Sequence, residues 1–181
     1  KTDLKIGDRK VSLKTGDAQL MSGGVNEASA TFYVAAETSG TSLDKAVADL
    51  GKHMNNLLPS TDMRKLGIKG NKTELKKMGK FAEIEILKNA DDAHRAFKND
   101  LRKVFTNNPA FAEAFTFEAM TGKVKFDDSD GTADHFLVTD YEGNATIHKT
   151  TSMSDDYVKK ISKQVKPDVK FKASQSTSSQ L

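Results

Sequence analysis

Patterns typical of β-strands occur near the two ends of this chain, and helical periodicity fills the interval between them. Residues 3–6 and 10–14 alternate around the turn-forming pair Gly7-Asp8, which predicts an antiparallel hairpin. Three further strands are predicted after the helical interval, at 123–126, 133–139 and 145–150. This order favours an α+β fold, or a mixed α/β one, in which several helices flank a small β-sheet.

The alternation in the hairpin also predicts which of its side chains face the interior, because successive strand residues point to opposite faces. One apolar set is expected to share the buried face, namely Leu4, Ile6, Val11 and Leu13. The polar set is expected to lie outside that face, and it includes Lys5, Ser12 and Lys14.

The helical interval divides at caps, prolines and glycines, which predict where individual helices begin and end. Helices are predicted over 26–38, 41–58 and 73–88, then from Asn89 or Asp91 to about 107. Asn108 and Pro109 are typical of a helix start, and Gly122 is typical of the position after a helix end. A last helix is predicted to begin at Ser154.

A chain of 181 residues suits one domain, which we place at 1–172 with a helical middle (26–121) and a strand-rich part (123–150). Residues 173–181 are rich in Ser and Gln and are expected to be a flexible tail. Residue 1 is Lys, so a processed chain or a fragment is expected. We find no signal peptide and no apolar run long enough to span a membrane, so we do not expect secretion by a signal peptide.

Charge and cysteine content narrow the function classes. The 28 basic and 25 acidic side chains are too balanced to indicate nucleic-acid binding by charge alone. Lysines nevertheless gather over residues 65–80, where Lys69, Lys72 and Lys76 are candidate phosphate contacts and a solvated helix face is the alternative. The absence of Cys excludes disulfides, thiolate metal sites and cysteine nucleophiles.

The candidate catalytic residues lie in the predicted hairpin, where Asp3 precedes one strand and Ser12 and Lys14 lie two apart on the next. Period-2 geometry places residues i and i+2 on one face, so both can point at the same ion and water. A carboxylate there can hold a divalent metal that lowers the pKa of its water and clamps a phosphate. A lysine beside it can orient that water or balance charge in the transition state.

Asp3 and the run Val11-Ser12-Leu13-Lys14-Thr15-Gly16 resemble the PD-(D/E)XK nuclease superfamily, over residues 3–36. The resemblance implies a nuclease that uses Mg²⁺ or Mn²⁺ on DNA phosphodiesters, with Asp3 as metal ligand and Lys14 assisting the water. Ser12 stands where the family has a second carboxylate, and a hydroxyl is a poor Mg²⁺ ligand. The family's helix-borne Glu has no counterpart upstream, so Glu118 is the candidate second ligand.

A second, weaker match to the same nuclease pattern consists of Glu118, Asp134 and Lys149. Ile147 stands there in the place of the second carboxylate. His135 and His148 flank a predicted turn and could face each other across a hairpin, either as a metal site or as a solvated pair. The acidic run 127–131 fails the calcium-loop pattern, because neither end position supplies a ligand.

The alternative function is a non-catalytic structural or interaction protein of a phage particle. Segments such as 11–24 and 118–126 resemble proteins of tailed phages, and Ser12 departs from the nuclease pattern. The resemblance implies a location in the host-cell cytoplasm or the virion. The expected partners are DNA or other virion proteins, with no membrane. The sequence leaves open whether the chain is an enzyme.

Overall fold

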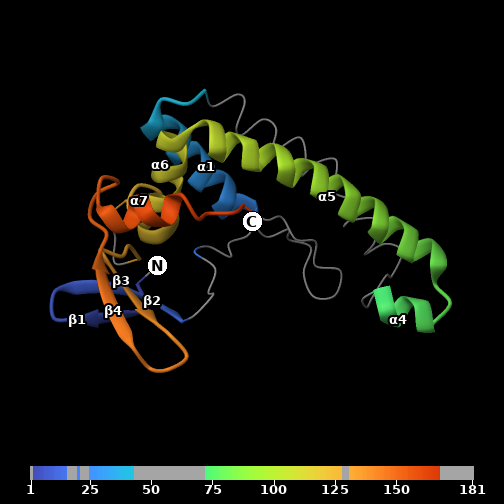
Figure 1. Cartoon of the computed structure of the whole chain (residues 1–181), viewed down its shortest axis with the longest axis horizontal. Helices are drawn as coiled ribbons and strands as arrows, with labels where there is room; N and C mark the ends of the chain where they lie inside the picture. Colours follow the sequence, from blue (N-terminus) through green and yellow to red (C-terminus); the bar gives the residue numbers. More distant parts are fainter. Residues whose placement is uncertain (1, 16–19, 21–24, 43–71, 128–130, 168–181) are drawn as a thin grey trace.

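Four short strands form one mixed sheet in the computed structural model, which describes residues 2–15, 20, 25–42, 72–127 and 131–167 (Figure 1). The strands lie side by side in the order β1 (Leu4–Ile6), β2 (Arg9–Thr15), β3 (His135–Thr139) and β4 (Ala145–Lys149). The outer pairs are antiparallel hairpins, whereas β2 and β3 run parallel. The predicted hairpins are therefore confirmed, and a parallel pair joins them.

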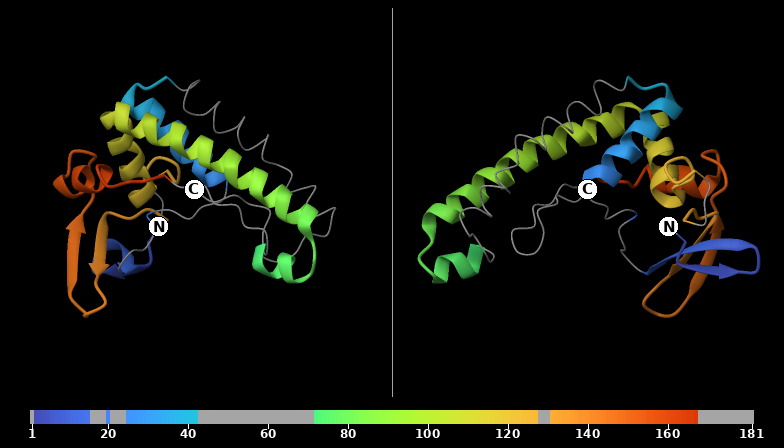
Figure 2. Two further views of the ribbon diagram at one scale, coloured as in Figure 1. Left: turned by 45° about the vertical axis from the view of Figure 1, so that its right-hand side comes forward. Right: turned by 180° about the vertical axis from the view of Figure 1, so that it is seen from behind.

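The described helices are α1 (Val25–Ser39), α4 (Lys72–Lys77), α5 (Phe81–Asn107), α6 (Pro109–Thr121) and α7 (Asp156–Ser162). Helices α1, α6 and α7 gather beside the sheet, and α5 leaves this body with α4 at its far end (Figures 1 and 2). The predicted α+β fold with a small sheet and several helices is thus confirmed. None of the helices in the described ranges is both long and apolar enough to cross a membrane.

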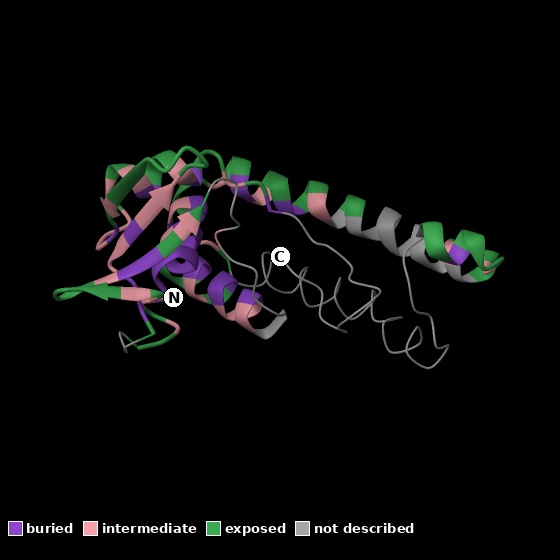
Figure 3. Cartoon of the chain, turned by 90° about the horizontal axis from the view of Figure 1, so that it is seen from below, coloured by how far each residue is buried: buried purple, intermediate pink, exposed green. Residues whose placement is uncertain are grey.

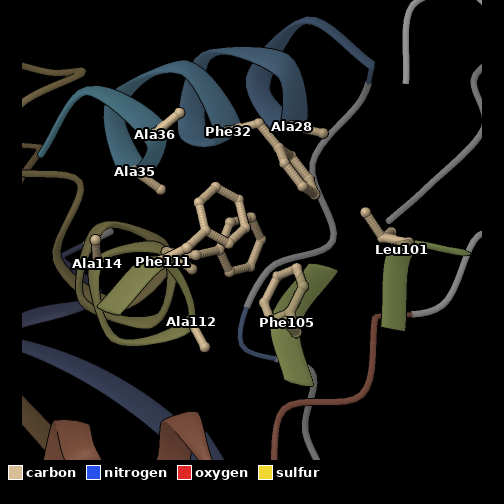
Figure 4. Packing of buried hydrophobic residues seen from close by; sticks show 11 residues of the cluster. Ala28, Phe32, Ala35, Ala36, Leu101, Phe105, Phe111, Ala112 and Ala114 are labelled. Atoms are coloured by element: carbon tan, nitrogen blue, oxygen red, sulfur yellow. The ribbon is translucent and has the colours of Figure 1, made fainter. Parts of the chain in front are cut away.

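A cluster of phenylalanines joins the helices to one another (Figure 4). Phe32 of α1 meets Phe105 of α5 and the α6 residues Phe111 and Phe115, with ring centroids 4.9 to 6.3 Å apart. Alanines of α1 at positions 28, 35 and 36 are buried beside them, which lets the helices approach closely. Several of these ring pairs are edge-on, the arrangement that aromatic quadrupoles favour.

The buried face of the hairpin differs from the predicted one. Strand register places Ser12 beside Phe136, and that face is covered by Met120 of α6 and Val158 of α7. The prediction that Ser12 lies outside the buried face is wrong, because Ser12 is only 2% exposed. On the opposite face Val11 is buried, but the other members of the apolar set are partly or largely exposed: Leu4, Ile6 and Leu13. The hairpin's own alternation does not say which face the distant helices cover.

The predicted break near Asn89 is also wrong, since α5 runs unbroken from 81 to 107. The break lies ten residues earlier, at Gly79, where φ is +68°. Gly79 N–H donates to the Lys76 carbonyl and Lys80 N–H to the Leu75 carbonyl, a pair of bonds typical of a Schellman end. A residue with φ above zero favours glycine, so this local signal outweighs the weaker helix-start residues at 89 and 91.

Other boundaries agree more closely. Helix α1 ends before Gly40, and α6 runs from Pro109 to Thr121 and ends before Gly122, both as predicted. Residues 123–126 form a turn instead of the predicted strand, for a reason that involves Glu118 and is given below. The last helix begins at Asp156, two residues after the predicted cap. The predicted helix over 41–58 and the predicted tail at 173–181 lie outside the described residues, apart from positions 41 and 42.

The phenylalanine cluster generates a prediction about stability. We expect Phe32→Ala to lower the free energy of unfolding by about 3–5 kcal/mol, because it removes a fully buried ring and leaves a cavity. Its neighbour Tyr33 is 51% exposed on the other side of α1, so Tyr33→Ala should cost less than about 1 kcal/mol. Urea titration measures both, and equal losses would show that α1 is not held by this cluster.

A second prediction concerns pH. The His148 ring of β4 stacks on Tyr157 of α7, with centroids 3.7 Å apart and planes 2° from parallel. Burial, and then the charge of Lys160, lower the pKa of His148 below its usual 6.5. The folded state therefore favours the neutral ring, and stability should fall as pH drops below about 6.5.

Urea midpoints between about pH 7.5 and pH 5 measure this loss, with His148→Phe as the matched variant. Phenylalanine keeps the stacked ring and cannot be protonated. The variant should therefore lose less stability than the wild type over the same interval. The same slope in both proteins would assign the pH dependence to other groups.

Candidate functional site

The candidate site lies just before β1, where the backbone and side chain of Asp3 continue the contacts with β2. Leu4, the first residue of β1, pairs with Val11. Asp3 donates its backbone N–H to the Val11 carbonyl over 2.9 Å. Its carboxylate Oδ2 then accepts the Leu13 N–H over 2.7 Å and the Ser12 hydroxyl over 3.1 Å. The sheet thus fixes the Asp3 carboxylate beside Ser12.

The three residues differ in exposure. Ser12 is buried, Lys14 is half-buried and Asp3 is exposed. Both bonds to the carboxylate end on Oδ2, and the exposed side chain carries a second oxygen, Oδ1. Lys14 lies two residues beyond Ser12 on the same face, a Cα separation of about 6.6 Å along a strand. Because a lysine stem is long and flexible, its ammonium can reach a group bound at Asp3.

Glu118 holds the turn that follows α6. Its side chain is only 1% exposed, and its two oxygens accept the N–H groups of Val124 (3.1 Å) and Lys125 (3.0 Å). These bonds explain why 123–126 is not a strand, because the N–H groups that a neighbouring strand would need are taken by a helix side chain. Glu118 and Asp3 belong to separate networks, and the proposal of Glu118 as a metal ligand stays a prediction.

One polar contact near Glu118 has no signal in the sequence. The Lys125 ammonium lies 3.0 Å from Glu27 Oε1 and donates to the Thr31 hydroxyl over 2.9 Å. The Lys125 side chain is 4% exposed and Glu27 is 33% exposed. This ion pair ties the turn after α6 to helix α1. The partners are 98 residues apart, so only the tertiary structure brings them together.

The residues of the second match to the nuclease pattern lie on three elements, with Glu118 on α6, Asp134 just before β3 and Lys149 at the end of β4. Asp134 Oδ1 accepts the Lys10 N–H over 2.9 Å and lies 2.6 Å from His135 Nδ1, which fixes it at the start of β3. Lys149 is the β4 partner of His135 and is exposed.

The two histidines of this hairpin point to opposite faces, because His135 pairs with Lys149 whereas His148 pairs with Phe136. The prediction that they face each other is therefore wrong. No three His, Asp or Glu side chains gather as a metal site within the described part of the chain.

Among the candidate nucleic-acid lysines, Lys76 is the one whose side chain the structure describes, and it is remote from the hairpin. Lys69 lies outside the described residues, as does the side chain of Lys72, which begins α4. Lys76 is exposed on α4, beside exposed Lys77. Figure 3 shows α4 at the end of α5 that points away from the sheet. At 1.5 Å per residue the 27 residues of α5 span roughly 40 Å, so the structure does not bring these lysines to Asp3.

No family model matches this sequence, and neither a curated protein nor a solved structure matches it. The function is therefore inferred from the geometry and from the resemblance of the hairpin residues.

Experiments can distinguish Glu118 as the acceptor that holds the turn after α6 from Glu118 as a metal ligand. We expect Glu118→Leu to lower the free energy of unfolding by about 2–4 kcal/mol, because two backbone N–H groups lose their acceptor. Glu118→Gln keeps one acceptor oxygen and should cost less. The control is Glu113→Leu on the same helix, at a half-buried position, which should cost least.

The same unfolding experiment, repeated with and without millimolar Mg²⁺, tests metal binding at Glu118. If Glu118 only holds the turn, Mg²⁺ should change the stability of the wild type and of Glu118→Gln equally. A stabilisation by Mg²⁺ that Glu118→Gln abolishes would instead make this carboxylate a ligand.

Proposed function

We propose that the chain is a nuclease-like domain that acts on DNA phosphodiesters with Mg²⁺ or Mn²⁺. The observation that carries the proposal is the hairpin arrangement: an exposed Asp3 carboxylate held beside Ser12, with Lys14 next along the same face. These are the residues on which the resemblance to the PD-(D/E)XK superfamily rests. Helix α1 follows β2, as that resemblance implies.

The donor set around Asp3 suits a metal that is completed by its substrate. Mg²⁺ commonly keeps several waters and is held by one or two carboxylates together with substrate phosphates. Asp3 supplies one such carboxylate, and the Leu13 N–H and the Ser12 hydroxyl both bond to its Oδ2. A bound metal would lower the pKa of a water and neutralise charge on the phosphate. Because Asp3 supplies a single carboxylate, we expect metal binding to be weak in the absence of DNA.

Each hairpin residue then has a distinct task. The Leu13 N–H and the Ser12 hydroxyl orient the Asp3 carboxylate, and their bonds to Oδ2 restrict its rotation. Lys14 places a positive charge on the same face, where it can hold a water or a phosphate oxygen as negative charge develops. Ser12 is a positioning residue here, because its hydroxyl is engaged with Asp3.

Cleavage assays test this assignment. Incubation of plasmid and single-stranded DNA with Mn²⁺ should give cleavage that falls at least about a hundredfold in Asp3→Asn and in Lys14→Met. Asparagine keeps an oxygen for the Leu13 N–H, so the hairpin should survive the loss of charge. Arg9→Met removes a cation from the opposite face of β2 and should leave cleavage unchanged.

The pattern of these variants decides the outcome. Cleavage that survives in Lys14→Met would remove the chemistry from this hairpin, with Lys149 as the next residue to substitute. Cleavage lost equally in Arg9→Met would indicate a general need for positive charge instead of a catalytic lysine.

The second candidate is a non-catalytic structural or interaction protein of a phage particle. Two observations favour it: Ser12 replaces a carboxylate, and the two oxygens of Glu118 are engaged by the turn after α6. No cleavage by the wild type with either metal, and no change in unfolding on adding Mn²⁺, would favour this function over the nuclease.

A further inference from the structure

The bend between α4 and α5 exposes two large apolar side chains among lysines. Met78 is 62% exposed and Phe81 is 65% exposed, although both lie within a few residues of the fully buried Leu75. Lys76 and Lys77 are exposed beside them, and Lys80 is half-buried in the bend itself. We name these five residues the tip: Lys76, Lys77, Met78, Lys80 and Phe81.

The bend has a defined backbone. Gly79 takes φ +68°, and the two bonds that close the end of α4 fix the path from Lys76 to Lys80. Leu75 of α4 is fully buried. Helix α5 begins directly afterwards, with Phe81 as its first residue. The side chains of the tip therefore start from a fixed backbone, and ordering them on a ligand costs less entropy than ordering a flexible loop.

The composition of the tip favours nucleic acid over protein. Lysine is depleted in protein interfaces, whereas it neutralises phosphates along nucleic-acid backbones. An exposed aromatic ring beside such lysines is a platform on which an unpaired base can stack. Bases inside a duplex are already stacked, so a lone phenylalanine selects single strands.

We propose that the tip binds single-stranded nucleic acid, with Lys76 and Lys77 on the phosphates and Phe81 stacked on a base. Met78 extends the apolar surface next to the ring. The identification of the strand as DNA rests on the proposed function, but the binding chemistry does not require cleavage. The tip lies at the far end of α5 from the hairpin, so it is a separate contact for the strand (Figure 1).

Binding is measured by fluorescence anisotropy in EDTA, with the full chain and a labelled oligothymidine of about 16 nucleotides, the upper site size of small single-strand-binding folds. Phe81→Ala should weaken binding by about fivefold to a hundredfold, the loss expected for one stacked base. Lys76→Ala/Lys77→Ala should lower the slope of log affinity against log salt by about 1.4. Circular dichroism checks that each variant remains folded.

The controls carry the same kinds of side chain elsewhere. Tyr141, 83% exposed in the turn between β3 and β4, supplies the aromatic control Tyr141→Ala. Lys159→Ala/Lys163→Ala removes two exposed lysines of the α7 region. Neither should reproduce the effect of its counterpart at the tip. An oligouridine of the same length tests whether the strand may equally be RNA, and a duplex should bind more weakly than either.

Two results would overturn the inference: unchanged affinity in both tip variants, or equal losses in the tip variants and their controls. Either result would indicate that Met78 and Phe81 contact a protein partner instead of nucleic acid. Failure of the nuclease proposal is separate, because binding in EDTA is measured without a metal and its dependence on Lys76, Lys77 and Phe81 does not require cleavage. Tip binding without cleavage would sustain this inference and refute the nuclease.

Discussion

The parallel pairing of β2 with β3 is the constraint on which the rest of the structure depends. It joins two hairpins whose strands lie more than 120 residues apart, from Val11 with His135 to Thr15 with Thr139. Separate two-stranded hairpins are marginal in water, whereas four strands with a covered face can be stable. The Asp134 carboxylate strengthens the junction by accepting the Lys10 N–H. A chain that failed to form this pair would lack a sheet for its helices to cover.

The same pairing of β2 with β3 buries Ser12 and so determines the surroundings of Asp3 at the hairpin site. Ser12 becomes buried because its neighbour across the junction is Phe136, which is covered by α6 and α7. A buried hydroxyl needs a hydrogen-bond partner, and Asp3 provides one at the exposed edge. The carboxylate is therefore held in place by the packing of residues far away in the sequence. A functional site on a hairpin edge would otherwise have only local bonds to fix it.

The features that the sequence predicts well are local ones. Gly7-Asp8 marks the first hairpin, and Pro109 and Gly122 bound α6. The errors arise where a distant partner decides the outcome. The apolar set on β2 predicts a buried face, but α6 and α7 cover the other one. Likewise, the strand pattern at 123–126 is overridden by two bonds from Glu118, which a pattern of apolar residues does not register.

Period-2 spacing places Ser12 and Lys14 on one face, and the hairpin around Gly7-Asp8 brings Asp3 to Ser12, so both contacts are local. The engagement of Glu118 with backbone N–H groups follows from no such local rule. A strand places i and i+2 residues together whatever the rest of the chain does, so this part of the site can be predicted from the sequence. A carboxylate on a helix has no such rule, since its partner depends on which turn lies next to it. The distance between the tip and the hairpin is equally hidden, because it is set by the unbroken length of α5. Helix α5 thus separates the tip from the hairpin, and near its other end Phe105 contributes to the phenylalanine cluster.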